Sequence, residues 1–372
     1  MRAHSIAIPF AFFLLLAGLV VATAAGAETP AAGPLELKPG RERAVVAVVA
    51  LNAGTEVTDF LVPYSVLNQA GAAVMAVAPS SDPVAFWPAA SVRPDADFAQ
   101  FDTAYPQGAD IVVVPAVHDP DDAALKAWLQ AQAQKGALMV SICEGSFALA
   151  AAGLLDGKRA TGHFYEHENR TETFPKVRWE RNRRYVEDEG VISSSGVSAS
   201  LPISLMLTER LAGRDRAAEL AAAYGVADYG PKHNTDAFNI GMEEITTALK
   251  NIAFGWPRAH YLIEVWDGVD EVNMAFPLDF AARTWRGSSA AIAAKAEIRT
   301  RHGLTIIADE TGEAPGGARL VRLPGAPASA AEAAVTLASP ATLREDFLAF
   351  IGEELGDKTA QFVATQLEYP RR

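Results

Sequence analysis

Four short apolar runs limit what this chain can fold into more than any other feature of its sequence. They cover residues 44–51, 72–78, 110–115 and 138–142. Each run has the length of a strand, and the first is an unbroken series of alanine, valine and leucine, as expected of a strand covered on both faces. Helical spacing fills the intervals at residues 59–69 and after the acidic cap at residues 119–122. This alternation predicts an α/β domain with a doubly wound, mostly parallel sheet.

The first 27 residues have the composition of a secretory signal. Arg2 precedes an apolar run at residues 6–21, and Ala25-Gly26-Ala27 is a small-residue cleavage site. The alternative is an uncleaved anchor, because about 20 apolar residues also suffice to span a bilayer. We expect residues 1–27 to be a signal peptide and the mature protein to be periplasmic or secreted.

The charge balance describes a folded acidic protein. The formal net charge is -13, and 50% of the residues are hydrophobic. Because phosphate backbones repel such a surface overall, we expect no nucleic-acid partner. No later run of the sequence is long and apolar enough to cross a membrane, so we expect no membrane contact beyond an uncleaved N-terminal anchor.

Two pairs of segments indicate an internal repeat. Residues 54–63 and 268–277 have equal length, begin with glycine and end with proline. Residues 108–115 and 317–324 share a Gly-Ala start, an apolar centre and a final proline. Similar βα units can also arise by chance, but the order of the matches favours a second, shortened copy of the same unit.

The repeat divides the chain into three parts after the signal segment. We expect a first α/β domain at residues 43–225, a turn-rich connection at residues 226–259 and a degenerate partial copy at residues 260–372. The second copy has Asn273 where the first has Asp59, and nothing in it replaces the single cysteine of the chain. We expect it to have lost the chemistry and to pack on the first copy like a built-in partner. Both an internal pseudo-dimer of this kind and a homodimer stay open.

That cysteine, Cys143, follows the fourth apolar run and precedes an Ala/Leu-rich helical segment. A sharp strand-to-helix turn would expose the side chain, and the N–H groups at the helix start would favour a thiolate. A lone cysteine in an exported chain has no internal disulfide partner and is therefore buried, paired between chains or reactive. The local sequence leaves a nucleophile elbow and a small core residue equally open.

Residues 143–164, Cys-Glu-Gly-Ser-Phe-Ala-Leu-Ala-Ala-Ala-Gly-Leu-Leu-Asp-Gly-Lys-Arg-Ala-Thr-Gly-His-Phe, resemble a signature of the ThiJ/PfpI family. Phe174-Pro175, Tyr185-Val186 and the serine-rich residues 192–199 follow in the order that this family uses. The resemblance covers residues 43–225. It implies a flavodoxin-like fold of the class I glutamine amidotransferase type, close to isonitrile hydratases and to the sensor halves of AraC-type regulators.

The resemblance also implies roles for single residues. Cys143 is the expected nucleophile, Asp59 the carboxylic acid that hydrogen-bonds its sulfur, and His163 either a proton donor or base or a residue that holds a loop. Residues around the elbow are expected to bind substrate: Glu144, Gly145, Val117, His118, Ser195 and Gly196.

Two departures from the family bear on these roles. Ala116 and Val117 follow Pro115 where relatives often have Pro-Gly-Gly, whose N–H groups would line an oxyanion hole. Glu144 stands beside the nucleophile where relatives carry small residues, threonine or histidine. A second acid there would disfavour anionic substrates.

A zinc site is the competing interpretation of residues 163–167, which have the His-x-x-Glu-His spacing of some zinc peptidases. That pattern is short, and no third ligand is evident, so we expect neither a metal nor another cofactor. We expect a cysteine-dependent hydratase or hydrolase acting on a small electrophilic substrate. The alternative is a noncatalytic domain that binds a small molecule or senses redox state.

Overall fold

The computed structural model describes residues 33–255, 258–328 and 332–370. Residues from Pro34 onward form one compact unit. The expected signal peptide at residues 1–27 lies outside the described residues. Among the described helices, none combines the length and the apolar character needed to cross a membrane.

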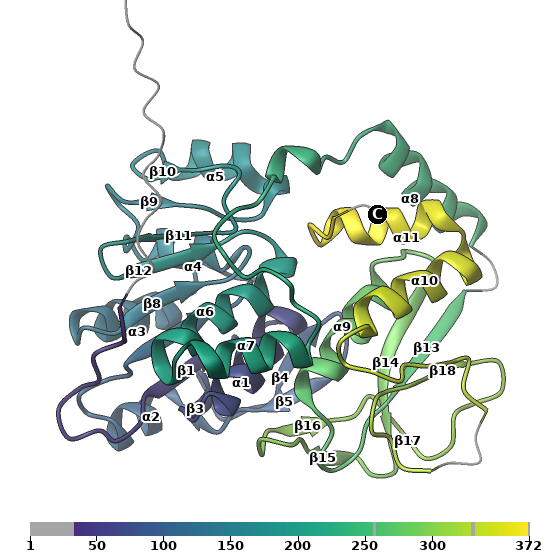
Figure 1. The fold of residues 1–372 in the computed structure, drawn as a ribbon, viewed down its shortest axis with the longest axis horizontal. Helices are drawn as coiled ribbons and strands as arrows, with labels where there is room; N and C mark the ends of the chain where they lie inside the picture. The colour runs from purple at the N-terminus through teal and green to yellow at the C-terminus, as the bar shows by residue number, and fades with distance from the viewer. Residues whose placement is uncertain (1–32, 256–257, 329–331, 371–372) are drawn as a thin grey trace, which may run out of the picture. The chain divides into compact units, whose positions relative to one another are not determined.

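A seven-stranded sheet forms the centre of the first copy (Figure 1). Its strands, in spatial order, are β11 (Tyr185–Asp188), β12 (Val191–Ser194), β8 (Leu138–Ser141), β7 (Ile111–Val114), β1 (Val45–Val49), β3 (Ala73–Ala78) and β6 (Ala96–Asp97). All neighbouring pairs are parallel except β11 with β12. The four apolar runs of the sequence are the strands β1, β3, β7 and β8, which confirms the predicted α/β class.

Both faces of this sheet are covered, which is why its strands are apolar throughout. Val46 and Val48 belong to one buried cluster, whereas Ala47 and Val49 belong to the cluster on the opposite face. The first face packs against α1 (Val57–Gln69) and α6 (Ser200–Ala212). The second face packs against α2 (Phe98–Ala104), α3 (Ala123–Gln134) and α4 (Gly145–Ala151). This arrangement is doubly wound, as the βα alternation predicts.

The remaining elements of the first copy are short or peripheral. They are β2 (Thr55–Glu56), β4 (Val84–Trp87), β5 (Ser91–Arg93), β9 (Arg159–Ala160), α5 (His167–Thr173), β10 (Arg178–Trp179) and α7 (Arg214–Ala223). Helix α8 (Met242–Phe254) lies within the turn-rich connection and leads to the second sheet.

The second sheet repeats the strand order of the first. Its order is β17 (Glu310–Thr311), β14 (Gly287–Ala293), β13 (Ala259–Glu264), β18 (Arg319–Arg322) and β19 (Val335–Thr336), all parallel. This corresponds to β6-β3-β1-β7-β8. Helix α9 (Glu271–Ala282) connects β13 to β14 as α1 connects β1 to β3, and the two helices contain Pro277 and Pro63. Helices α10 (Leu343–Leu355) and α11 (Asp357–Gln366) complete this part.

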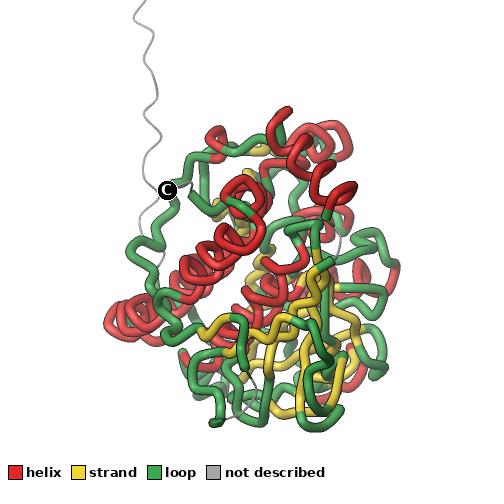
Figure 2. The backbone as a smooth tube through the Cα atoms, turned by 90° about the vertical axis from the view of Figure 1, so that its right-hand side faces the viewer, coloured by secondary structure: helices red, strands yellow, loops and turns green. Residues whose placement is uncertain are grey.

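The two copies pack against each other through their equivalent helices. Helices α1 and α9 are in contact, and one buried cluster contains both Phe60 and Phe276. A mixed sheet also joins the copies, because β16 (Thr305–Ile307) pairs antiparallel with β5 and extends to β15 (Glu297–Arg299). In Figure 2, helices lie on both sides of the strands. The second copy therefore covers a surface of the first.

The pairing of β5 with β16 generates a prediction about stability. Val92 and Ile306 are opposite each other and fully buried, so Ile306→Ala should lower the free energy of unfolding by about 2–5 kcal/mol. Urea denaturation should show one transition, and Cys143 should become accessible to a thiol reagent at the same midpoint. Ile252→Ala, at a residue that is 49% exposed on α8, is the control and should change stability by less than about 0.5 kcal/mol. Two separate transitions would contradict this coupling between the copies.

Candidate active site

Cys143 lies on a sharp turn between strand β8 and helix α4. Its backbone has φ 54°, in the left-handed region, and its N–H donates to the carbonyl oxygen of Ser195 at 3.0 Å. A Cβ on Gly145 would lie 2.0 Å from the carbonyl oxygen of Val114. Only glycine therefore allows α4 to begin against the end of β7. The turn has the geometry of a nucleophile elbow.

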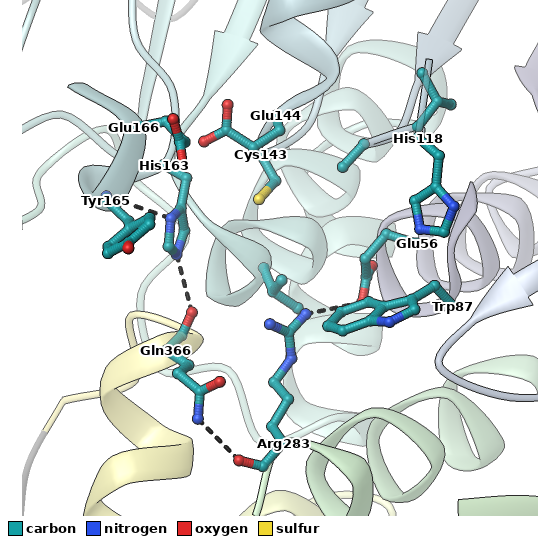
Figure 3. Close-up of a pocket in the computed structure, with 13 residues that line it drawn as sticks. Glu56, Trp87, His118, Cys143, Glu144, His163, Tyr165, Glu166, Arg283 and Gln366 are labelled. Carbon is teal, nitrogen blue, oxygen red and sulfur yellow. Dashed lines mark hydrogen bonds and ion pairs between the residues drawn. The ribbon is translucent and has the colours of Figure 1, made fainter. Parts of the chain in front are cut away.

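The elbow opens on a cavity of about 220 Å³. Side chains from both copies line it: Glu56, Trp87, Ala116, Val117, His118, Cys143, Glu144, His163, Tyr165, Glu166, Val197, Arg283 and Gln366. Among the residues expected from the sequence, five lie in this wall: Cys143, Glu144, Val117, His118 and His163. Figure 3 shows the sulfur of Cys143 directed into the cavity.

Three residues expected to bind substrate do not line the cavity. Gly145 packs against the end of β7, and Ser195 accepts the N–H of Cys143 through its carbonyl group. A Cβ on Gly196 would lie 2.5 Å from Cδ2 of His163, so this glycine makes room for the imidazole. These residues support the elbow from behind, outside the cavity wall, and their contact with substrate stays a prediction.

Arg283 is the main contribution of the second copy. It follows the last residue of α9, and its Nε donates to Asp279 at 2.6 Å. Its Nη2 lies 3.4 Å from a carboxylate oxygen of Glu56, and its guanidinium stacks 4.7 Å from the centre of the Trp87 ring. Gln366 of α11 donates to the carbonyl oxygen of Arg283 at 2.9 Å. The second copy lacks a nucleophile, yet its Arg283 and Gln366 line the cavity that Cys143 faces. That it has lost the chemistry stays a prediction.

Asp59 is fully buried in the first turn of α1. Its carboxylate accepts the N–H of Ala116 at 3.4 Å and the hydroxyl of Ser200 at 3.1 Å. Among the described contacts there is no hydrogen bond from Asp59 to the sulfur, contrary to expectation, because these two protein donors occupy its oxygens. Burial raises the pKa of Asp59 to about 7.

The thiol of Cys143 is held in its protonated form. Burial raises its pKa well above the ordinary value, and the charge of Asp59 adds to the effect, followed by the charges of Glu144 and Glu56. The guanidinium of Arg283 opposes this increase. Since the thiolate is the nucleophilic form, attack by Cys143 requires a group that takes its proton.

Glu144 is a partly buried acid in the cavity wall. Its Oε1 accepts a hydrogen bond from Arg170 at 3.0 Å, whereas its buried Oε2 has no partner among the described residues. Burial raises the pKa of Glu144 to about 8, although the charge of Arg170 acts in the opposite direction. At neutral pH this side chain is mostly a neutral acid that can donate a hydrogen bond.

Both nitrogens of His163 are already engaged. Nε2 donates to the carbonyl oxygen of Gln366 at 2.9 Å, and Nδ1 accepts the N–H of Tyr165 at 3.4 Å. Burial lowers the pKa of His163, in keeping with a neutral imidazole. Of the two roles that the sequence left open, the geometry favours the structural one, in which His163 connects the first copy to α11.

Backbone N–H groups are available beside the sulfur. Loop 115–118 is fixed by the N–H of Glu56 to Ala116 and by the N–H of His118 to Gly54. Among the described residues, the N–H groups of Val117 and Glu144 have no acceptor. Two such donors next to a nucleophile can stabilise a developing anion, so the loss of the glycines common in relatives leaves the donors in place.

The sequence reasoning missed Glu56, Trp87, Arg283 and Gln366. Glu56 carried a signal, because its carboxylate caps α1 by accepting the N–H of Asp59, three residues later, at 2.6 Å. The other three carried none. They reach the cavity through the packing of one copy on the other.

Residues 44–210 match the model of the DJ-1/PfpI family. The transcriptional regulator GbdR of Pseudomonas aeruginosa is 41% identical over 96 residues, which are 26% of this chain and 25% of the regulator. The isonitrile hydratase of Pseudomonas putida is 34% identical over 90 residues, or 24% of this chain and 38% of the hydratase. A solved ThiJ/PfpI family protein from Pseudomonas syringae is 26% identical, covers 52% of this chain and 81% of its own, and has a TM-score of 0.43.

The matched segments span less than half of the two curated relatives. One of these relatives is a helix-turn-helix regulator. The comparisons therefore do not support the expectation that a nucleic-acid partner is absent.

The raised pKa of Asp59 generates a prediction about stability. The folded chain keeps the Asp59 proton up to about pH 7, whereas the ordinary value for an aspartic acid is 3.8, so folding takes up a proton between these values. The free energy of unfolding of the wild type, relative to Asp59→Asn, should fall as the pH rises from about 4 to 7. Urea denaturation across this range measures the difference. Asp215→Asn, on the exposed first turn of α7, is the control, and a pH-independent difference for Asp59→Asn would contradict the assignment.

Proposed function

Residues 44–210 form a domain of the DJ-1/PfpI family, and from this premise we propose that the protein is a cysteine-dependent enzyme that adds water to a small electrophilic substrate. The observation that carries the proposal is the position of Cys143, on a left-handed turn at the wall of a small cavity, beside two N–H groups without acceptors. A merely structural cysteine needs no such turn.

The proposed reaction begins with attack of the Cys143 sulfur on an electrophilic carbon. The thiol proton leaves as the carbon–sulfur bond forms, and we assign it to the ionised carboxylate of Asp59, which has no direct hydrogen bond to the sulfur among the described contacts. The N–H groups of Val117 and Glu144 stabilise the charge that develops on the substrate. Asp59 then returns this proton to the substrate, either to the heteroatom of a carbonyl group or to the carbon of an isonitrile. Water adds to the same carbon, the carbon–sulfur bond breaks, and Cys143 recovers a proton. The sum is addition of one water molecule, without a change in oxidation state.

The cavity limits the size of the substrate. A volume of about 220 Å³ accommodates a small molecule beside the sulfur. Isonitriles, 2-oxoaldehydes and small amides satisfy this limit. The similarity to an isonitrile hydratase supports including the first class.

A second candidate function is the binding or sensing of a small molecule without turnover. The similarity to the regulator GbdR favours it, as does a Cys143 thiol whose pKa burial raises rather than lowers. In that case the cavity would be a ligand site, and Cys143 a contact within it.

We also propose that the chain is exported, on the strength of residues 1–27. Their charged start, apolar run and Ala-Gly-Ala end are typical of a secretory signal. Export would separate this protein from cytoplasmic DNA, which supports the enzyme over a DNA-binding regulator.

A substrate screen distinguishes the two candidate functions. Wild type and Cys143→Ser should be tested with isonitriles, 2-oxoaldehydes, amides and peptides. We expect turnover of at least one class by the wild type and a loss of at least about 10³-fold in Cys143→Ser, since removal of a nucleophile costs that order of rate. Turnover that survives the substitution would disprove the mechanism. Thermal stabilisation by a compound that is never turned over would favour the sensor.

The pH dependence of the reaction tests the two acids separately. Attack needs Asp59 ionised, with a pKa of about 7. It is slowed when Glu144 loses its proton, at a pKa of about 8, because a further negative charge then lies beside the developing anion. The kcat/KM of the free enzyme should therefore rise through about pH 7 and fall above about pH 8. Glu144→Gln should remove the alkaline decline, and Asp59→Asn should remove the acidic rise together with most activity. A pH-independent profile in the wild type would contradict both roles.

A further inference from the structure

The guanidinium of Arg283 has an unused edge that faces the cavity. Nε is bound to Asp279 at 2.6 Å, and the contact of Nη2 with Glu56 is long, at 3.4 Å. Nη1 has no acceptor among the described residues. Because Trp87 stacks on one face of the group, further hydrogen bonds must form in its plane.

The free edge points toward the nucleophile. Figure 3 shows the guanidinium of Arg283 and the sulfur of Cys143 directed toward each other from opposite sides of the cavity. Gln366, which holds the backbone of Arg283, is in turn bonded to His163. The arginine is therefore fixed relative to the elbow by contacts on both sides.

Glu56 and Glu144 in the cavity wall need not repel an anionic ligand. Burial raises the pKa of Glu144 to about 8, so this acid is mostly neutral at pH 7. Burial also raises the pKa of Glu56 well above its ordinary value, and this carboxyl group is paired with Arg283. The unpartnered Oε2 of Glu144 can then donate a hydrogen bond rather than repel a negative charge. This reverses the effect expected of Glu144 from its charge alone.

We infer that the cavity binds a small monocarboxylate, with the substrate carboxylate on the free edge of Arg283 and the electrophilic carbon next to it, facing Cys143. The inference rests on the proposed function for the role of Cys143, and it adds the class of substrate. A planar carboxylate matches the in-plane donors of a guanidinium, which an uncharged group matches less well. The second copy thereby supplies the residue that determines specificity.

Two ligands of the same size test the inference without any reaction. Propionate and propionamide differ mainly in charge, and neither is an electrophile that needs Cys143. Calorimetric titration of the full chain carrying Cys143→Ala at pH 7 should show propionate binding at least about tenfold more tightly, the order expected of a charge-assisted hydrogen bond. Adding Arg283→Met should abolish this preference.

Arg286→Met is the matched control for the arginine. Arg286 lies three residues further along and borders a separate groove beside α8, so its loss should leave the preference for propionate intact. Arg283→Lys keeps a charge but loses the fork, and should retain only part of the preference. Circular dichroism of each variant reports whether it folds. The comparison of propionate with propionamide uses the chain that retains Arg283, so it remains informative even if an Arg283 variant does not fold.

Equal binding of propionate and propionamide, or no saturable binding of propionate, would overturn the inference. So would a preference that survives Arg283→Met. None of these results bears on the nucleophile. If Cys143-dependent turnover of uncharged substrates were then observed, the proposed function would stand. Only the inference that the substrate carries a carboxylate would be disproved.

Discussion

Helix α1 has no face left for solvent, and the rest of the structure follows from that constraint. Its residues 57–67 are all buried. One side packs on the first sheet and α6, and the other packs on α9. A helix buried all round must satisfy its polar side chains inside the protein, which explains why Thr58 contacts Asp279 and Ser65 contacts His302, both in the second copy. The second copy is thus part of the core of the first.

The same burial sets the electrostatics of the site. Glu56 and Asp59 lie at the start of α1, where both side chains are buried and Arg283 supplies a nearby positive charge. The protein stabilises fewer negative charges there than it has acids, so protons remain on carboxyl groups and on sulfur at neutral pH. A proton taken from Cys143 therefore has an acceptor in Asp59, whose pKa of about 7 is close to neutral pH. This favours proton transfer during attack over a preformed thiolate.

The sequence was sufficient for the features that depend on neighbouring residues. The apolar runs located β1, β3, β7 and β8, and the spacing of glycine and proline matched α1 with α9. The sequence did not predict which residues of the tight turn at Cys143 line the cavity and which lie behind it. Gly145 lies two residues after Cys143, yet the left-handed turn directs Cys143 into the cavity and Gly145 against the end of β7. Nor did the sequence predict Arg283, because the packing of two segments more than 200 residues apart leaves no local pattern.

Equivalent positions of α1 and α9 carry different residues, which is possible because both copies belong to one chain. Counting from Pro63 and Pro277, Gln69 of α1 corresponds to Arg283, which follows α9. Gln69 bonds to the hydroxyl of Tyr224, whereas Arg283 reaches the cavity. In a symmetric dimer one residue would have to serve both positions. Because both copies are on one chain, their equivalent positions can differ: the first has Cys143 and Asp59, whereas the second has Asn273 and an arginine that faces the nucleophile. The absence of a cysteine from the second copy and the presence of Arg283 in the cavity wall are therefore two aspects of the same asymmetry.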